Sequence, residues 1–286
     1  MSREPQSRKD REKETRRPKV TPKKVPEGSL LRALYMLMPL ILYYLFRIGM
    51  LALLQAGIGI LGAGNPGEEL SADYTWPVAL MTGFTALGLW LVYRKSEPMR
   101  EDPERTPGKR WKAALAVVLL GALLAMGLNI LASFITGNLS ESVRDSLNIP
   151  KTPQTSGYLA GLVLYGLLSP LSEELLFRWL LLNRIERVFN TKMAIALCAL
   201  FFGIYHGNVM QGCYAFLMGL ALAYICVAAK SLAAAFLFHC SANVVIYSLL
   251  FLPEGVRGVA ESLPMGALYL LAGIGGMLLF ARRKKI

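Results

Sequence analysis

Long apolar runs dominate the chain, and short polar segments separate them. Each run holds about 20 residues, the length that a helix needs to cross a bilayer. The runs cover residues 33–62, 76–93, 113–136, 157–180, 192–210, 212–229, 231–251 and 265–281. No segment alternates apolar and polar positions as a membrane β-strand does, and backbone groups in lipid must be paired internally. We therefore expect an all-α, polytopic membrane protein of about eight transmembrane helices.

Composition and charge support this expectation. The 286 residues are 54% hydrophobic, too apolar for an ordinary soluble domain. The net charge of +12 follows the topology: 25 of the 31 Lys and Arg residues fall in segments expected on one side of the membrane. Those segments are 1–29, 94–112, 181–192, Lys230 and 282–285. The positive-inside rule then places both termini in the cytoplasm, and the charge does not indicate a nucleic-acid partner.

Two parts of the chain differ in character. Residues 1–29 are dense in charge and lack an apolar core, so they predict a disordered, basic cytoplasmic tail and not a signal peptide. Docking of this tail on anionic lipid is the alternative. Residues 30–286 predict one helical membrane domain. We expect an integral, multi-pass protein of the cell (plasma) membrane, with the bilayer as its surroundings and no prediction for its oligomeric state.

A few charged residues and both histidines of the chain lie inside the apolar runs. Besides Arg47, they are Glu173, Glu174, Arg178, His206 and His239. A charged side chain at the centre of a membrane helix costs about 2.5–3.5 kcal/mol on insertion scales. Such residues are expected to face a cavity or one another. We expect Arg47 to be a packed or snorkelling cation.

The spacing of these residues predicts one polar pocket. Glu174 and Arg178 are four residues apart and share a helix face, as do His239 and Asn243. A carboxylate, two imidazoles and an amide from three helices suit the activation of water and the stabilisation of an oxyanion. The alternatives are a structural Glu174–Arg178 ion pair, a hydrogen-bonded buried Glu173, and histidines that belong to the core.

Three motifs in this order resemble a known family. They are Glu173-Glu174-x-x-x-Arg178, Phe202-x-x-x-His206 and His239-x-x-x-Asn243, within about residues 157–250. Together they resemble the CPBP family of CAAX prenyl endopeptidases and bacteriocin-processing (Abi) intramembrane proteases. Trp179 departs from the pattern, since a glycine is common after the arginine.

The resemblance implies proteolysis of a membrane-associated peptide or protein substrate. It implies that Glu173 and His206 activate the attacking water, that His239 and Asn243 stabilise the oxyanion, and that Glu174 and Arg178 orient the site. Zinc held by Glu173, His206 and His239 is the alternative to a glutamate-type reaction, because two His and one Glu form some catalytic zinc sites. We favour a reaction without a metal cofactor, since the chain has no H-E-x-x-H motif.

The expected spans contain one geometric conflict. Glu173 falls near the inner end of the span 157–180, whereas His206 lies about 22 Å from that end in the next span, at 1.5 Å per residue. Either Pro170 breaks the helix, or the spans end elsewhere. Two other functions also remain open: a non-enzymatic immunity or assembly factor on the same scaffold, and a proton-coupled transporter, which the lack of an inverted repeat disfavours.

Overall fold

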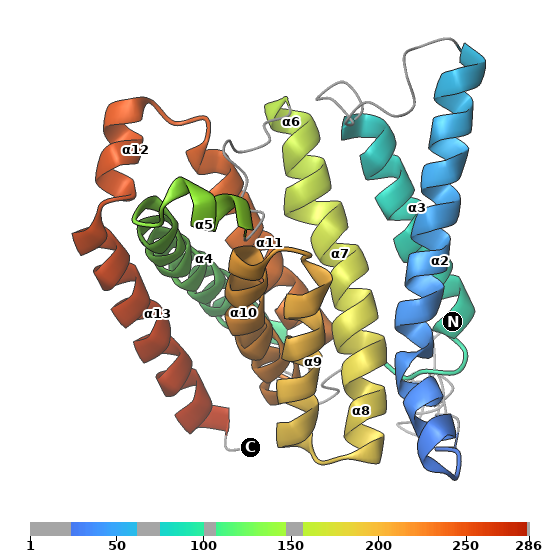
Figure 1. Cartoon of the computed structure of the whole chain (residues 1–286). Helices are drawn as coiled ribbons and strands as arrows, with labels where there is room; N and C mark the ends of the chain where they lie inside the picture. Colours follow the sequence, from blue (N-terminus) through green and yellow to red (C-terminus); the bar gives the residue numbers. More distant parts are fainter. Residues whose placement is uncertain (1–23, 62–74, 100–106, 147–156, 285–286) are drawn as a thin grey trace, which may run out of the picture.

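The computed structural model describes residues 24–61, 75–99, 107–146 and 157–284, so most of the tail 1–29 lies outside the described residues. Within these ranges the chain forms helices and connecting loops, without a strand. The helices pack side by side into one bundle, and the start of α2, the α8–α9 turn and the end of α13 lie at the same end of it (Figure 1). The expected polytopic helical architecture is confirmed.

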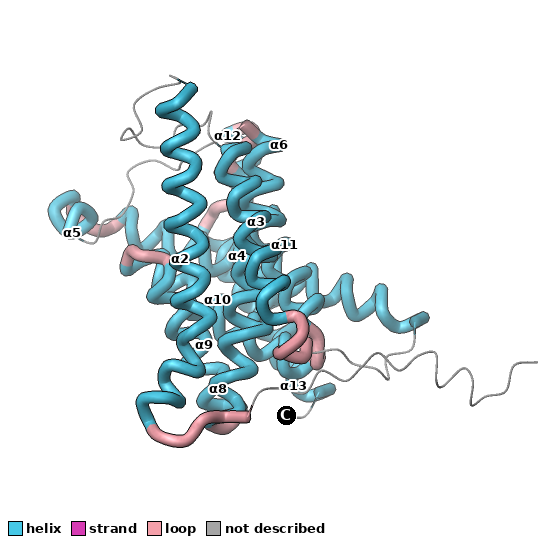
Figure 2. The backbone as a smooth tube through the Cα atoms, turned by 90° about the vertical axis from the view of Figure 1, so that its right-hand side faces the viewer, coloured by secondary structure: helices cyan, strands magenta, loops and turns pink. Residues whose placement is uncertain are grey.

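The helices follow the apolar runs closely. The first three long helices are α2 (Ser29–Leu61), α3 (Thr75–Tyr93) and α4 (Pro107–Gly137), and the last three are α10 (Val209–Ala228), α11 (Leu232–Leu249) and α13 (Leu263–Lys284). Two short helices, α5 (Glu141–Ser146) and α12 (Glu254–Ala260), lie in the connecting segments. α11 and α13 both pack on α4. Figure 1 shows α2 at the right-hand edge of the bundle, and Figure 2 shows it in front, on the face turned to the viewer.

A continuous helical rod occupies residues 158–188. It consists of α6 (Tyr158–Gly161), the π-helical turns η2 (Leu162–Leu168), α7 (Ser169–Glu174), the π-helical turns η3 (Leu175–Leu181) and α8 (Leu182–Val188). The rod contacts α2, α3 and α11. Every residue from 172 to 185 is buried, as expected of a helix surrounded by other helices. The polar residues of α7 therefore lie inside the bundle.

The rod resolves the geometric conflict in favour of shifted boundaries. Pro170 does not break it, because residues 168 and 169 keep right-handed helical dihedrals. The helix continues to Val188, well beyond the expected end at residue 180. Residues 181–188 were assigned to the inner side of the membrane, after the end of the span, and they continue the helix instead of forming a loop. Arg184 and Arg187 bind the buried Glu97, at 2.8 and 2.7 Å, so their charges are compensated within the protein.

The helix in the expected span 192–210 is, in contrast, shorter than predicted. Within the described residues, seven helical segments are long and apolar enough to cross a membrane, and α9 (Thr191–Tyr205), with 15 residues, is not among them. α9 packs against α10, to which a short turn joins it. The polar stretch after Tyr205 belongs to that turn. The chain thus reverses at His206, and this residue lies within the bundle.

Candidate active site

A buried network joins α7 to α11 behind the expected site. The Glu174 carboxylate accepts a hydrogen bond from His239 Nδ1 at 2.8 Å, and Arg178 Nη1 lies 3.1 Å from the same oxygen. Arg178 is fully buried, its Nη2 donates to the Gly219 carbonyl, and its guanidinium lies 4.3 Å from the centre of the Phe202 ring. The pair Glu174–Arg178 thus exists, and it fixes the ring of His239.

His239 bridges the two adjacent acids. Its Nδ1 is occupied by Glu174, whereas its Nε2 lies 3.6 Å from Glu173 Oε2. A carboxylate only accepts, so the hydrogen bond to an ionised Glu174 places a proton on Nδ1. The Nε2 atom can then interact with groups in the neighbouring cavity, which His239 lines.

His206 ends α9 and is held by its own helix. Its Nδ1 lies 2.8 Å from the Phe202 carbonyl oxygen, one turn earlier. Because a carbonyl cannot donate, Nδ1 carries the proton and Nε2 of the neutral ring is free to accept one. Gly207 follows at φ +78°, a left-handed conformation that glycine adopts without strain, and Asn208 then caps α10. This turn presents His206 to the interior of the bundle.

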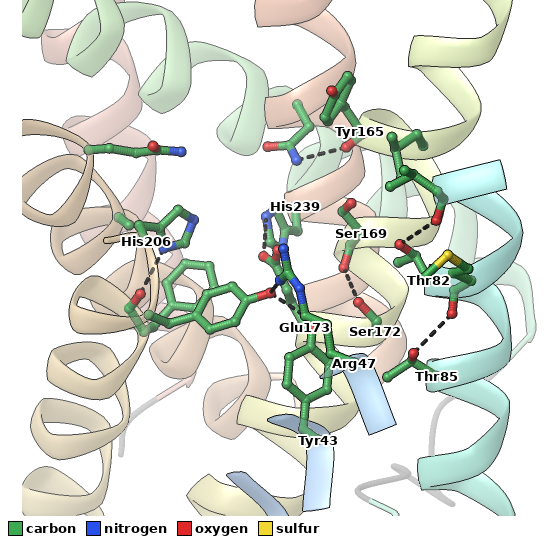
Figure 3. Close-up of a pocket in the computed structure, with 18 of the residues that line it drawn as sticks. Tyr43, Arg47, Thr82, Thr85, Tyr165, Ser169, Ser172, Glu173, His206 and His239 are labelled. Carbon is green, nitrogen blue, oxygen red and sulfur yellow. Dashed lines mark hydrogen bonds and ion pairs between the residues drawn. The ribbon is translucent and has the colours of Figure 1, made fainter. Parts of the chain in front are cut away.

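The four residues expected to be catalytic line one cavity. It has a volume of ≈ 570 Å³, and its walls include Glu173, His206, His239 and Asn243. Figure 3 shows His206 to the left of Glu173 and His239, on a different helix. Asn243 Nδ2 donates to the Tyr165 carbonyl at 2.8 Å, which leaves the second hydrogen of its amide group. Glu174 and Arg178, expected to support the site, do not line the cavity and lie behind it.

Among the wall residues that sequence reasoning did not assign to the site, three polar side chains form a connected group. Tyr43 and Arg47 of α2 and Tyr205 of α9 line the cavity, and their side chains are joined: the two tyrosine hydroxyls are 2.7 Å apart, and Arg47 Nη1 donates to the Tyr205 hydroxyl at 2.9 Å. Arg47, expected to be a packed or snorkelling cation, thus packs on Tyr205 of α9 and also lines the cavity. The available signal was its charge in the middle of an apolar run.

The departure at Trp179 also has a structural explanation. This side chain is buried, and its indole Nε1 donates to the backbone carbonyl of Glu97 at 3.2 Å. Trp179 thereby belongs to the same cluster as the Glu97 ion pairs, at the end of α3. It lies away from the cavity and does not obstruct it.

The residues of the alternative zinc site do not form a ligand cluster. In the part of the chain that the structure describes, no three His, Cys, Asp or Glu side chains are placed to hold a metal ion. Glu173, His206 and His239 share the cavity, and a protein oxygen lies beside Nδ1 of each histidine, so each Nε2 is the nitrogen that a metal would bind. The three side chains are nevertheless not gathered into a set that could hold a zinc ion in this arrangement.

A protein-family model matches this part of the chain. Residues 155–245 match the model described as type II CAAX prenyl endopeptidase Rce1-like. The segment is Rce1-like. No curated protein and no solved structure matches the chain. The Rce1-like segment contains all three motifs and the helices that position Glu173, His206, His239 and Asn243, and the resemblance to the CPBP family is confirmed over it.

The match and the apolar helices together support the broad class of the protein. It is an integral, multi-pass membrane protein, and the Rce1-like segment supports a CAAX-protease-like intramembrane endopeptidase in general. The match covers about a third of the chain, and α2, α3 and α4 lie outside it. Arg47 and Tyr43 therefore come from outside the Rce1-like segment.

Proposed function

We propose that this protein hydrolyses a peptide bond of a membrane-associated substrate, in the cavity lined by Glu173, His206, His239 and Asn243. The observation that carries the proposal is the convergence of these four side chains from three helical segments on one cavity. Nothing in simple bundle packing requires both histidines of the chain to meet there. The reaction class is that of a CAAX-type intramembrane endopeptidase, acting in the plasma membrane.

Glu173 and His206 activate the attacking water in this proposal. Glu173 supplies a carboxylate at the cavity wall, and His206 supplies Nε2, which can accept a proton because Nδ1 donates to Phe202. A water between them loses a proton as its oxygen attacks the carbonyl carbon of the substrate. The proton then passes to the leaving amine as the C–N bond breaks.

His239 and Asn243 stabilise the oxyanion of the tetrahedral intermediate. Asn243 offers its remaining amide hydrogen. His239 donates from Nε2 when it is doubly protonated, and the charge of that imidazolium is balanced by Glu174 at its Nδ1. Donors fixed before the reaction avoid reorganisation when the negative charge forms. Arg178 in turn holds Glu174 in place.

The test uses the purified protein in lipid and a pool of membrane peptides. We expect wild-type protein to release fragments, and His206→Ala and His239→Ala to be folded but inactive. A non-enzymatic assembly or immunity factor would instead keep its cellular effect in both variants. A transporter would show a proton or solute flux that these substitutions abolish, without peptide release.

A further inference from the structure

We propose that Arg47 binds a carboxylate group of the peptide substrate and thereby selects which peptide bond lies at Glu173 and His206. This inference rests on the proposed function. It concerns a side chain of α2, outside the Rce1-like segment, which the proposed hydrolysis does not use.

The first argument is the charge of Arg47. Within the described residues, no carboxylate lies within ion-pair distance of its guanidinium; the buried arginines Arg178 and Arg184, by contrast, each pair with an acid. A cation on a membrane helix is costly without a partner, and such residues face interior cavities where function requires them. Among the described carboxylates, Glu173 interacts with this charge only at longer range, so a substrate carboxylate can still take the place of a direct ion-pair partner.

The second argument is the direction of the side chain. Arg47 lines the same cavity as Glu173 and His206 (Figure 3). One of its donors is used by the Tyr205 hydroxyl, which fixes the guanidinium toward α9. A guanidinium has five N–H donors in a planar arrangement that matches the two oxygens of a carboxylate. The hydrogen bond to Tyr205 thus orients the guanidinium and leaves its other N–H donors to bind a carboxylate.

The third argument is the position relative to the reacting groups. Tyr205 precedes His206 directly, so the residue that orients Arg47 adjoins the proposed base. A peptide held at Arg47 by a carboxylate would extend across the cavity toward Glu173 and His239. The bond that is cut would then be set by its distance along the chain from the carboxylate.

The carboxylate has two possible sources, a free C-terminus or an acidic side chain. The probes are therefore three synthetic peptides with the same N-terminal acyl anchor and neutral sequence: one with a free C-terminus, one amidated, and one amidated with a single Glu near its end. We expect wild-type protein to cleave at least one of the two acidic peptides about 10- to 100-fold faster, in kcat/KM, than the neutral peptide, the usual effect of a charge-assisted hydrogen bond. Faster cleavage of the first peptide would show that Arg47 binds the free C-terminus. Faster cleavage of the third would show that it binds an acidic side chain.

Arg47→Gln should abolish this preference, so that kcat/KM for the acidic peptide falls to the value for the neutral peptide in the same variant. Arg47→Lys should retain part of it. Moving the preferred carboxylate by one residue should move the cleaved bond by one residue in wild-type protein, as mass spectrometry of the fragments would show. An equal loss on all three peptides, or no preference in wild-type protein, would overturn the proposal.

Two controls separate this role from others. Tyr205→Phe removes the hydrogen bond that orients Arg47 but keeps the cation, so the carboxylate preference should weaken and still exceed that of Arg47→Gln. A complete loss, equal to that of Arg47→Gln, would assign Arg47 to holding the helices together. Arg32 lies at the start of the same helix and outside the cavity, so Arg32→Gln should leave kcat/KM unchanged for all three peptides. If no peptide is cleaved, the proposed hydrolysis fails, and binding of the same peptides still tests Arg47: equal affinity for acidic and amidated forms would reject it.

Discussion

The Glu174 carboxylate lies 2.8 Å from Nδ1 of His239, buried between α7 and α11. Both residues come from motifs that are 65 positions apart, and Arg178 approaches the same oxygen. The acid is thus shared between a cation and an imidazole. This relationship assigns Glu174 to positioning His239, since the acid itself does not reach the cavity.

Glu174→Gln should therefore impair the reaction without removing a group that touches the substrate. The amide keeps the shape of the acid but loses the charge that balances a doubly protonated His239. We expect the cleavage rate kcat to fall about 100-fold or more, comparable to losing one oxyanion donor, while peptide affinity is retained. Kinetics on a cleaved peptide would measure both. A variant with the wild-type kcat would contradict this role.

His206→Asn separates the two nitrogens of the imidazole. The Asn amide can replace Nδ1 as the donor to the Phe202 carbonyl, but it has no counterpart of Nε2. We expect the fold and the unfolding temperature to be retained and the rate to fall about 100- to 10,000-fold, the usual contribution of a general base. Circular dichroism and peptide cleavage would measure this. Substantial remaining activity would exclude Nε2 as the base.

Gly207→Ala should disturb the turn that presents His206. The residue has φ +78°, where a Cβ atom costs about 1–2 kcal/mol. We expect a lower free energy of unfolding and a reduced cleavage rate. Gly258→Ala is the matched control, because Gly258 lies in α12 with no heavy atom within 4 Å of an added Cβ. Equal effects of both substitutions would reject the argument from the turn.

Glu97→Gln tests the ion pairs that hold Arg184 and Arg187, two arginines of the helical segment that was expected to be a loop. The side chain of Glu97 is fully buried and binds both Arg184 and Arg187. Removing its charge leaves these cations without their partner, at a cost of about 3–5 kcal/mol in the free energy of unfolding. Denaturant unfolding in mixed micelles would measure it. Glu261→Gln, at an exposed pair 3.9 Å long, should change stability by less than about 0.5 kcal/mol. A similarly small effect at Glu97 would show that the buried pairs contribute little.

Chelators test the choice between the glutamate-type reaction and zinc. We expect cleavage to continue at its full rate after dialysis against EDTA or 1,10-phenanthroline. Loss of activity that added zinc restores would require Glu173, His206 and His239 to act as metal ligands, in an arrangement other than the one described.

Local patterns predicted most of the helices and four residues of the cavity wall, because apolar runs and four-residue spacing depend only on neighbouring positions. The end of the rod was not predictable in this way. Arg184 and Arg187 look like loop residues until Glu97, almost ninety positions earlier, is placed beside them. The short length of α9 likewise depends on the turn at Gly207. The role of Arg47 depends on the packing of α2 against residues more than 150 positions away.

The most direct test of the account is quantitative mass spectrometry of membrane proteins from cells that carry either wild-type protein or Glu173→Gln. We predict that the variant accumulates at the wild-type level and folds, and that one or more membrane proteins persist uncut in its presence, with their cleavage fragments found only beside wild-type protein. Identical peptide profiles in the two strains, under conditions where the wild-type protein is present, would contradict hydrolysis in this cavity.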